Sequence, residues 1–516
     1  MSASPPVGLF FGSNVDDSAT PPSSERNRLV TDLVLHYACK PFLKKGHQEE
    51  GTLHFWNTSK CAPQSDVFYW YNAKFPTVGV EECIPFHDES YIKFLRIRET
   101  LSEVDERVQE TMGSGAEEVT TSAVISPSNI KRMRVESSRP PSYARRSCPG
   151  EPLLTSPTHH TEPPPIRPLP DLIPIPLDED YQLTKDAFPF LGLWRSVSST
   201  LSGTLTALRW LLGEGEEQTE PTKRLAAVHW FGGRHHAKSG SGGGFCYVND
   251  VVLAALHWRS VLRQRQEKRS KLLIVDLDAH HGDGTETAFL FDPSVYTLSV
   301  HAFEVGVYPH TGEATQTGKG LGKHCNLNLP LPVGTTDAVY VPLARRAIRT
   351  AVDHIGPQEL GGVLLVCGAD GLKGDPLGNL NLSVGGLQSV SRLVMDVCAE
   401  LHCPLLLLGA GGYVDTSTAK LAAVVTRDLL SYAANVGDST ARYSQSPWLV
   451  ESGVQVPDEC YYFTRYGPSF LMHVTPAARC ELVNSLSPSH PYYESWHQLQ
   501  EKLVKASKKE EDGSSP

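Results

Sequence analysis

The stretch VDLDAHHGDG at residues 275–284 holds three aspartates and two adjacent histidines directly after the apolar run at 272–274. Asp276 and Asp278 share one face of a strand because side chains alternate, and His280, two residues further on, can turn over the strand end to join them. Carboxylate and imidazole groups at this spacing are suitable metal ligands. Asp278 and His280 therefore predict two of the three protein ligands of a zinc ion that keeps a position open for water.

The third ligand is expected from Asp370, which ends the apolar run GGVLLVCGAD at 361–370. In a parallel sheet the carboxyl ends of the strands meet at one edge. An aspartate, histidine, aspartate set suits zinc, iron(II) or cobalt, and zinc is the default because of its availability. Gly368 and Leu372 stand where a second metal ion would need another carboxylate, so one ion is predicted. The alternative is that each acid caps a loop or pairs with an arginine. Several polar clusters occur together at strand ends, and this coincidence favours the metal site over that alternative.

Two adjacent histidines, His235 and His236, follow the apolar run LAAVHW at 225–230 and lie in a glycine-rich segment. A single histidine there would more often be structural, but adjacent side chains diverge and cannot both enter the core. Two imidazoles beside a candidate metal site predict proton-transfer groups. Each needs a carboxylate on its far nitrogen to fix its tautomer. Asp276 and Asp283 are the acids that remain for this role.

Two further segments, SGSGGGF at 239–245 and GAGGY at 409–413, are rich in glycine and allow close approach of the backbone. Neither has the spacing of a P-loop or a dinucleotide-binding fingerprint, so neither predicts phosphate binding. A generic flexible loop is the alternative for the first segment. Tyr413, after a strand end, is well placed to donate a hydrogen bond to an oxyanion.

The elements that must position these residues alternate along the chain. Short apolar runs are found at 225–230, 271–278, 295–301, 361–370 and 404–412, and longer amphipathic segments at 248–262, 338–355, 387–401 and 418–433. Short continuous apolar strands separated by helices predict an α/β fold whose parallel sheet is covered on both faces. Ligands bind at the carboxyl ends of such strands, which is where the polar residues above occur.

Composition narrows the class of protein. The 516 residues carry a formal net charge of −11, which disfavours a protein that coats nucleic acid but is compatible with a basic partner. The 11 cysteines form no CxxC pair, so neither a disulfide framework nor a cysteine zinc finger is indicated. The chain shows no signal-peptide pattern and no run of about 18 apolar residues, so a soluble, intracellular protein is expected.

One segment departs from the globular pattern. Residues 103–182 are rich in proline, serine and arginine and predict a disordered insertion, because helix and sheet interiors exclude proline. Basic residues stand among serines near its centre: Lys131, Arg132, Arg134, Arg139, Arg145 and Arg146. They form either a solvated charge cluster or a nuclear-import signal or phosphorylation-controlled segment.

Several stretches together resemble the zinc-dependent histone deacetylases, specifically the class I branch, of the arginase/deacetylase fold. They are FHDESYIKFL (86–95), GGRHHAKSGSGGGFCYVND (232–250), VDLDAHHGDGTETAF (275–289), TLSVHAFEVGVYPHTGE (297–313), VCGADGLKGDPLGNLNLS (366–383), LGAGGY (408–413) and PDECYYFTRYGPSFLMHVTPA (457–477). The resemblance implies three α/β/α layers around a central, mainly parallel sheet of about eight strands. It also implies one catalytic domain, 1–480, interrupted by the insertion and followed by a C-terminal helix and polar tail at 481–516.

The resemblance further implies the role of each catalytic residue. Zinc would be bound by the three ligands already predicted. His236, oriented by Asp283, would be the general base and acid. His235, oriented by Asp276, would tune the site electrostatically, and Tyr413 would polarise the acetyl carbonyl together with the metal.

Other residues would bind the substrate and structural ions. The substrate-binding residues would be Asp186 at the tunnel rim, Gly244, the aromatic walls Phe245 and Tyr308, and Leu377 at the tunnel mouth. Structural potassium ions would be bound by Asp276, Asp278, His280, Phe289, Asp292, Val295, Ser299 and Val300. Arg26 would lie beside an internal channel.

The chain departs from the family pattern at several positions. Tyr308 replaces the usual phenylalanine and adds a hydroxyl to the tunnel wall, and Ala410 interrupts the usual glycine run. Basic residues that class I members use to bind an inositol phosphate against a corepressor align with Ser23, Pro376 and Thr416. A corepressor-type complex would therefore lack the usual inositol phosphate contacts.

The implied function is hydrolysis of N6-acetyl-lysine in histone tails or other proteins, in chromatin and transcription regulation, with residence in the nucleus and also the cytoplasm. Neither sequence-specific nucleic acid binding nor a membrane association is expected. Two alternatives stay open: a scaffold subunit that binds acetyl-lysine without turnover, and an amidohydrolase for acetylpolyamines.

Overall fold

The structure is a computed structural model that describes residues 6–11, 24–44, 65–71, 74–98, 177–184, 186–214, 224–434 and 453–474. The predicted C-terminal helix and tail at 481–516 and the basic cluster at 131–146 lie outside the described residues.

The described strands form one sheet of eight strands in the order β2-β1-β3-β8-β7-β4-β5-β6, and every neighbouring pair is parallel. The strands are β1 (Val7–Phe10), β2 (Phe68–Tyr71), β3 (Ala226–His229), β4 (Lys271–Asp276), β5 (Val295–Ala302), β6 (Asn326–Leu331), β7 (Leu360–Val366) and β8 (Leu405–Leu408). The predicted parallel α/β sheet is confirmed.

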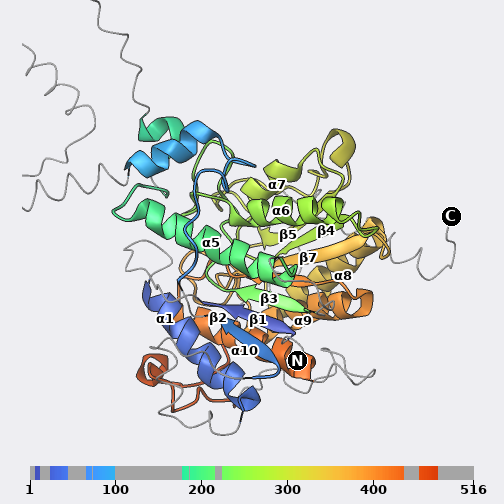
Figure 1. The fold of residues 1–516 in the computed structure, drawn as a ribbon. Coiled ribbons are helices and arrows are strands. Elements are labelled where there is room, and N and C mark those ends of the chain that lie inside the picture. Colours follow the sequence, from blue (N-terminus) through green and yellow to red (C-terminus); the bar gives the residue numbers. More distant parts are fainter. Residues whose placement is uncertain are drawn as a thin grey trace, which may run out of the picture.

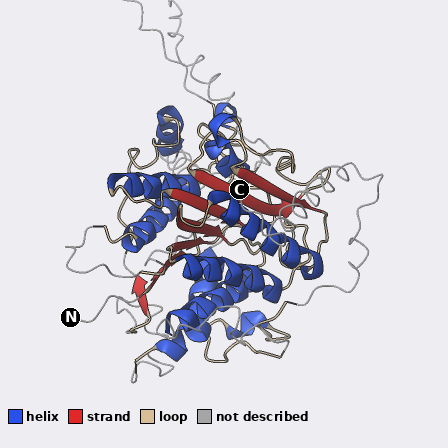
Figure 2. Ribbon diagram, turned by 90° about the vertical axis from the view of Figure 1, so that its right-hand side faces the viewer, coloured by secondary structure: helices blue, strands red, loops and turns tan. Residues whose placement is uncertain are grey.

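Helices cover both faces of this sheet (Figures 1 and 2). One face is covered by α5 (Leu193–Leu211), α6 (Asp250–Gln264) and α7 (Asp283–Phe289). The other is covered by α1 (Ser24–Leu33), α8 (Asp337–Ile355), α9 (Val384–Leu401) and α10 (Asp415–Ala434). Figure 1 shows α5 and α6 above the strands and α1 and α10 below them, which is the three-layer arrangement that was predicted.

Alternate residues of each central strand enter two different cores. In β4, Leu273 and Val275 pack in the core beneath α8, α9 and α10, whereas Leu272 and Ile274 pack in the core beneath α5 and α6. Because both faces are apolar, these strands are continuous hydrophobic runs in the sequence, which is the signal that predicted them.

Side-chain caps set several helix boundaries close to the strand ends. Asn249 Oδ1 accepts a hydrogen bond from Val252 N at 3.0 Å where α6 begins, and Ser383 Oγ accepts one from Gly386 N at 3.0 Å where α9 begins. The short helical segments are the π-helix η1 (Val34–Cys39) and the 3-10 helices η2 (Lys40–Phe42), η3 (Asp178–Tyr181), η4 (Gly320–Gly322) and η6 (Phe463–Tyr466). In the part of the chain that the structure describes, no helix is long and apolar enough to cross a membrane.

The last residues of the predicted insertion 103–182 belong to the folded domain. Residues 177–182 are described and include η3, and Arg98 donates two hydrogen bonds of 2.8 Å each to the Asp178 carboxylate. The remainder of that interval, 103–176, lies outside the described residues.

Candidate metal and active site

Asp278, His280 and Asp370 converge at the carboxyl edge of the sheet. Asp278 follows β4 and Asp370 follows β7, and these two strands are parallel neighbours. One oxygen of each carboxylate and one His280 nitrogen all lie within 4.8 Å of one another, and all three side chains are buried. His280 Nδ1 lies 2.8 Å from Asp370 Oδ2 and 3.2 Å from Asp278 Oδ1. One ion can therefore contact all three predicted ligands.

Backbone amides and glycines hold the two carboxylates in place. Ala279 N donates to Asp370 Oδ1, and Gly411 N donates to Asp278 Oδ2, both at 2.8 Å. A Cβ atom at Gly411 would collide with Asp370 Oδ2, and one at Gly368 would collide with Asp278 Oδ2. Both positions need glycine because the carboxylates approach the backbone so closely.

The charge of this group fits a divalent cation. Burial and the Asp278 carboxylate raise the pKa of Asp370 to about 7. Burial would lower the pKa of His280, but the Asp370 and Asp278 carboxylates raise it to about 11. Two buried carboxylates at this spacing repel each other unless a positive charge lies between them. Two carboxylates and one imidazole are a donor set that zinc accepts with a coordination position left for a further ligand.

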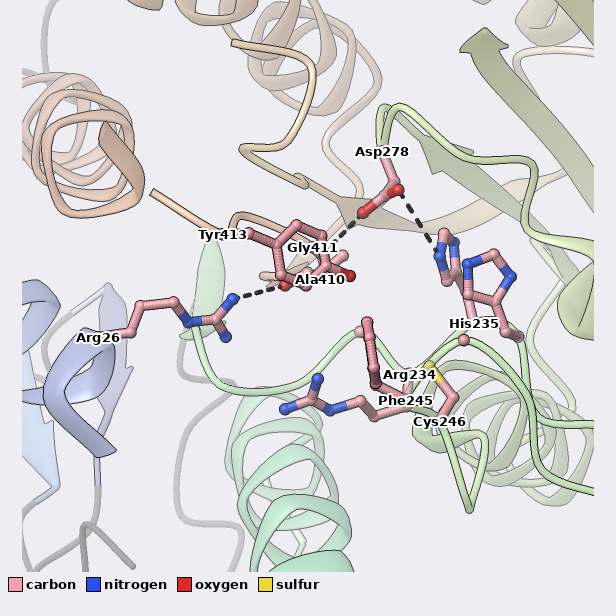
Figure 3. Close-up of a pocket in the computed structure, with 12 residues that line it drawn as sticks. Arg26, Arg234, His235, Phe245, Cys246, Asp278, Ala410, Gly411 and Tyr413 are labelled. Carbon is pink, nitrogen blue, oxygen red and sulfur yellow. Dashed lines mark hydrogen bonds and ion pairs between the residues drawn. The ribbon is translucent and has the colours of Figure 1, made fainter. Parts of the chain in front are cut away.

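Two histidine–aspartate pairs lie beside the candidate metal ligands. His235 Nδ1 is 2.7 Å from Asp276 Oδ2, and His236 Nδ1 is 2.9 Å from Asp283 Oδ1. The two imidazole rings are 4.0 Å apart, and His235 Nε2 lies 3.8 Å from Asp278 Oδ1 (Figure 3). The orienting acids are those expected from the sequence, and each holds Nδ1 so that Nε2 of the same ring is left for chemistry.

The two histidines differ in their tendency to bind a proton. Burial would lower the pKa of His235, but Asp276 and Asp278 raise it to about 9. Burial and the neighbouring His235 lower the pKa of His236 to about 4, against the influence of Asp283. These shifts favour the protonated form of His235 and the neutral form of His236, which can accept a proton.

Aromatic rings stand in front of these groups. The Tyr308 ring centroid lies 5.0 Å from that of His236, and the Phe245 ring centroid lies 5.8 Å from that of Tyr413. Phe245 has a φ of 61°, and the preceding Gly244 donates its N–H to Asp186 Oδ2 at 3.0 Å. The four predicted substrate residues other than Leu377 are thus brought together around the histidines.

A carboxylate that the sequence reasoning missed connects Tyr413 with Leu377. Asp375 Oδ2 accepts from Tyr413 N at 2.7 Å, and Asp375 Oδ1 accepts from Leu377 N at 2.9 Å. Leu377 is 40% exposed, while its carbonyl oxygen lies 3.1 Å from His280 Nε2. Asp375 lies in a loop, where no periodic pattern marks functional residues. Only its position two residues before Leu377 could have pointed to its role.

Arg26 reaches the site from the other end of the chain. It is buried on α1, and its Nη1 donates to the carbonyl oxygens of Ala410 and Gly412 at 3.1 and 3.2 Å (Figure 3). Burial and the nearby Arg234 lower its pKa to about 9. Arg26 lines a pocket together with Gly233, Arg234, His235, His236, Gly244, Phe245, Cys246, Asp278, Ala410, Gly411 and Tyr413. Arg26, which was expected beside an internal channel, thus lies next to the two histidines and Tyr413.

The start of α6 holds the histidine loop in place, which the sequence reasoning also missed. Asp250 accepts from Gly233 N at 3.0 Å and from Arg234 N at 2.6 Å, and Asn249 Nδ2 donates to His235 O at 3.1 Å. Asn-Asp before an apolar periodic run is a helix N-terminus signature. That signature predicted the helix. It did not predict that the polar groups of Asn249 and Asp250 also bind the backbone of the histidine loop.

The residues expected to bind potassium fall in two places. Asp276 and Ser299 are register partners on β4 and β5, next to the candidate metal ligands, and Val300 follows in β5. Phe289 ends α7, Val295 begins β5, and Asp292 between them forms an ion pair with Arg259. The two sets lie at opposite ends of β5.

The fold and this group of residues define a class of α/β proteins with a polar site at the carboxyl edge of a parallel sheet. A model of the histone deacetylase domain matches residues 52–429. Because this match covers more than half of the chain, the chain belongs to the histone deacetylase family.

Individual relatives agree with this assignment. The chain is 33% identical to histone deacetylase 8 of Xenopus laevis over 300 residues, which are 58% of this chain and 80% of that protein. It is 32% identical to histone deacetylase 8 of Danio rerio over 304 residues, 59% of this chain and 70% of that protein. It is 37% identical to histone deacetylase 19 of Arabidopsis thaliana over 258 residues, 49% of this chain and 43% of that protein.

Proposed function

We propose that the protein is a zinc-dependent lysine deacetylase that hydrolyses the acetyl amide of N6-acetyl-lysine in histone tails or other proteins. The observation that carries this proposal is the buried Asp278, His280 and Asp370 group with the His236 imidazole, held by Asp283, next to it. A scaffold that only binds acetyl-lysine would not need a base held in this way.

The metal would be held by these three side chains. When bound, zinc supplies a Lewis acid that polarises the amide carbonyl and lowers the pKa of water. The same donor set would accept cobalt or iron(II).

His236 moves the proton. Its Nδ1 is held by Asp283, so Nε2 accepts a proton from the attacking water and then gives that proton to the leaving lysine amine. His235, held by Asp276, lies 3.8 Å from Asp278 Oδ1, and in its protonated form it would offset negative charge that develops nearby.

Tyr413 stabilises the oxyanion. Burial and the Asp370 and Asp278 carboxylates raise the pKa of its hydroxyl well above the ordinary value, so the group stays protonated and can donate. Asp375 fixes the backbone from which this side chain extends.

The aromatic side chains beside the candidate active site select the substrate. Phe245 and Tyr308 offer apolar faces that accept the methylenes and neutral amide of an acyl-lysine but do not solvate a free ammonium group. At the rim, Asp186 holds the Gly244 amide with one carboxylate oxygen and would accept N–H groups of the substrate backbone with the other. Arg26 lies on the wall of the same pocket as His236 and Tyr413.

The test is deacetylation of an acetyl-lysine histone peptide by the full chain, compared with His236→Ala and a matched control, His257→Ala, whose half-buried imidazole pairs with Glu214 away from the site. We expect turnover by the wild type and by the control, and a loss of about 10²–10⁴-fold in His236→Ala. Full turnover by His236→Ala would show that the base is assigned wrongly. Peptide binding by the wild type without turnover would favour the scaffold, and a preference for acetylspermidine would favour the polyamine amidohydrolase.

We also propose structural potassium at the two places named above, because carbonyl and carboxylate oxygens are suitable ligands for this hard cation. Replacing potassium with a large organic cation should lower the melting temperature, and an unchanged melting temperature would speak against these sites.

Location and partners form a separate proposal, supported by the basic cluster at 131–146 and by Pro376 and Thr416 where basic residues would bind an inositol phosphate. We propose residence in the nucleus as well as the cytoplasm, and a corepressor-type complex that does not depend on inositol phosphate. Deletion of 131–146 should reduce nuclear accumulation, and an unchanged distribution would remove the cluster as its cause.

A further inference from the structure

A second group of ligand-type side chains lies where α1 meets the segment 453–474, apart from the candidate active site. Asp32 comes from α1, His36 from η1 and Cys460 from that segment. One oxygen of the Asp32 carboxylate, one His36 nitrogen and Cys460 Sγ all lie within 4.8 Å of one another, and all three residues are buried. The three atoms are close enough to contact a single ion.

The surrounding contacts orient these side chains. His36 Nδ1 lies 2.9 Å from the Asp32 carbonyl oxygen and 3.1 Å from Asp32 Oδ1. The backbone N–H groups of Tyr461 and Tyr462 donate to the two oxygens of the Asp32 carboxylate at 3.3 and 3.2 Å. Metal-binding imidazoles and carboxylates are commonly held by second contacts of this kind.

One polar atom of the group is left without a partner. His36 Nε2 has no hydrogen bond within the described structure, although His36 is only 3% exposed. An ion pair of His36 with Asp32 does not account for this, because a protonated imidazole would then bury an N–H donor with no acceptor. A cation in the group would contact one of the two His36 ring nitrogens, both of which are buried.

We propose that Asp32, His36 and Cys460 bind a second, structural zinc ion. Carboxylate, imidazole and thiolate are the side-chain ligands of zinc, and the thiolate favours zinc over magnesium or calcium. On binding, the Cys460 thiol gives up its proton to solvent, and a further ligand from solvent or backbone completes four-coordination.

This ion would tie the two ends of the described chain together. The hydrogen bond from Tyr461 N to Asp32 already joins residues 429 positions apart. The same helix, α1, carries Arg26, whose side chain bonds to the carbonyls of Ala410 and Gly412. The proposed site would thus stabilise the helix that supplies one wall of the catalytic pocket.

The experiment uses the full chain loaded with cobalt(II) in place of zinc. Thiolate ligands give cobalt(II) a near-ultraviolet charge-transfer absorption, and the group of Asp278, His280 and Asp370 contains no thiolate. The band therefore reports on the second site alone. Zinc content by elemental analysis is measured in parallel for the wild type, Cys460→Ser, Asp278→Asn and a control, Cys39→Ser, whose buried thiol at the end of η1 lies outside the group.

We expect the charge-transfer band in the wild type, Asp278→Asn and Cys39→Ser, its loss in Cys460→Ser, and one zinc ion fewer per chain in Cys460→Ser than in the wild type. A wild-type cobalt chain without the band, or a Cys460→Ser chain that keeps it, would overturn the proposal. If Cys460→Ser does not fold, the band in the wild type and in Cys39→Ser decides. Loss of zinc only in Asp278→Asn would refute this site and leave the active-site proposal intact.

Discussion

Replacement of Asp283 by asparagine tests how His236 is held. The Asp283 carboxylate contacts His236 Nδ1 at 2.9 Å and Lys238 Nζ at 2.9 Å, and its side chain is 9% exposed. Asparagine keeps the shape but removes the charge, and its amide N–H₂ can donate to Nδ1, which places the ring proton on Nε2. In that tautomer His236 cannot accept the water proton.

The expected loss of kcat/KM is large because the contact between Asp283 and His236 is buried. Groups that orient a metal-bound histidine are worth about 10–100-fold in activity. An aspartate-to-asparagine change at the residue that orients the catalytic histidine of a serine protease costs about 10⁴-fold in kcat. We therefore expect Asp283→Asn to lower kcat/KM by about 10²–10⁴-fold. Lys238→Met is the matched control, since this ammonium is 44% exposed and its ion pair contributes at most about 1 kcal/mol, or about fivefold.

The pH profile adds a second readout. The Asp283 carboxylate raises the pKa of His236 against burial. Without that charge the pKa of His236 falls further, so the acid limb of kcat/KM, where protonation inactivates the base, moves to lower pH. A folded Asp283→Asn enzyme with kcat/KM within about twofold of the wild type, or with its acid limb moved to higher pH, would refute this account.

Three further outcomes are expected. Tyr413→Phe removes one donor to the oxyanion and should lower kcat by about 10²–10³-fold with little change in KM in steady-state kinetics, whereas an unchanged kcat would mean that this hydroxyl does not contact the oxyanion. Gly411→Ala places a methyl group against a carboxylate of the metal group and should lower zinc content and activity together, with Gly453→Ala, where the new Cβ meets open space, as the control that must retain both. Asp428→Asn leaves Arg392 buried without the carboxylate 2.6 Å away and should lower the free energy of unfolding in urea by about 3–5 kcal/mol, and a loss below about 1 kcal/mol would contradict this.

The convergence of the candidate metal ligands was predictable because they follow strong strand signals. Asp278 and Asp370 stand at the ends of apolar runs, and parallel strands bring such ends to one edge whatever their register. The acids for the two histidines then followed by elimination, since Asp276 and Asp283 were the carboxylates left over. The structure places both acids within hydrogen-bond distance of the expected rings.

Other elements depend on contacts that no local pattern reveals. Strands β1 and β2 have four residues each, which is too few to show a periodic hydrophobic pattern. Strand β6 contains Pro330, which an edge strand tolerates but which weakens the sequence pattern that would predict a strand. The Asp32 and His36 pair has the i, i+4 spacing of one helix face, a common arrangement. Its link to Cys460 arises only when the chain has folded.

The position of β8 in the sheet has a consequence for how the protein is made. This strand comes last in chain order among the eight, yet it lies between β3 and β7. Without residues 405–408, no strand would join β2-β1-β3 to β7-β4-β5-β6. The histidine loop follows the first set of strands, and the candidate metal ligands follow the second. A nascent or truncated chain that stops earlier would expose two apolar strand edges and leave the sheet before the histidine loop unjoined to the sheet that carries the candidate metal ligands, which would make it a client for chaperones and a substrate for proteases.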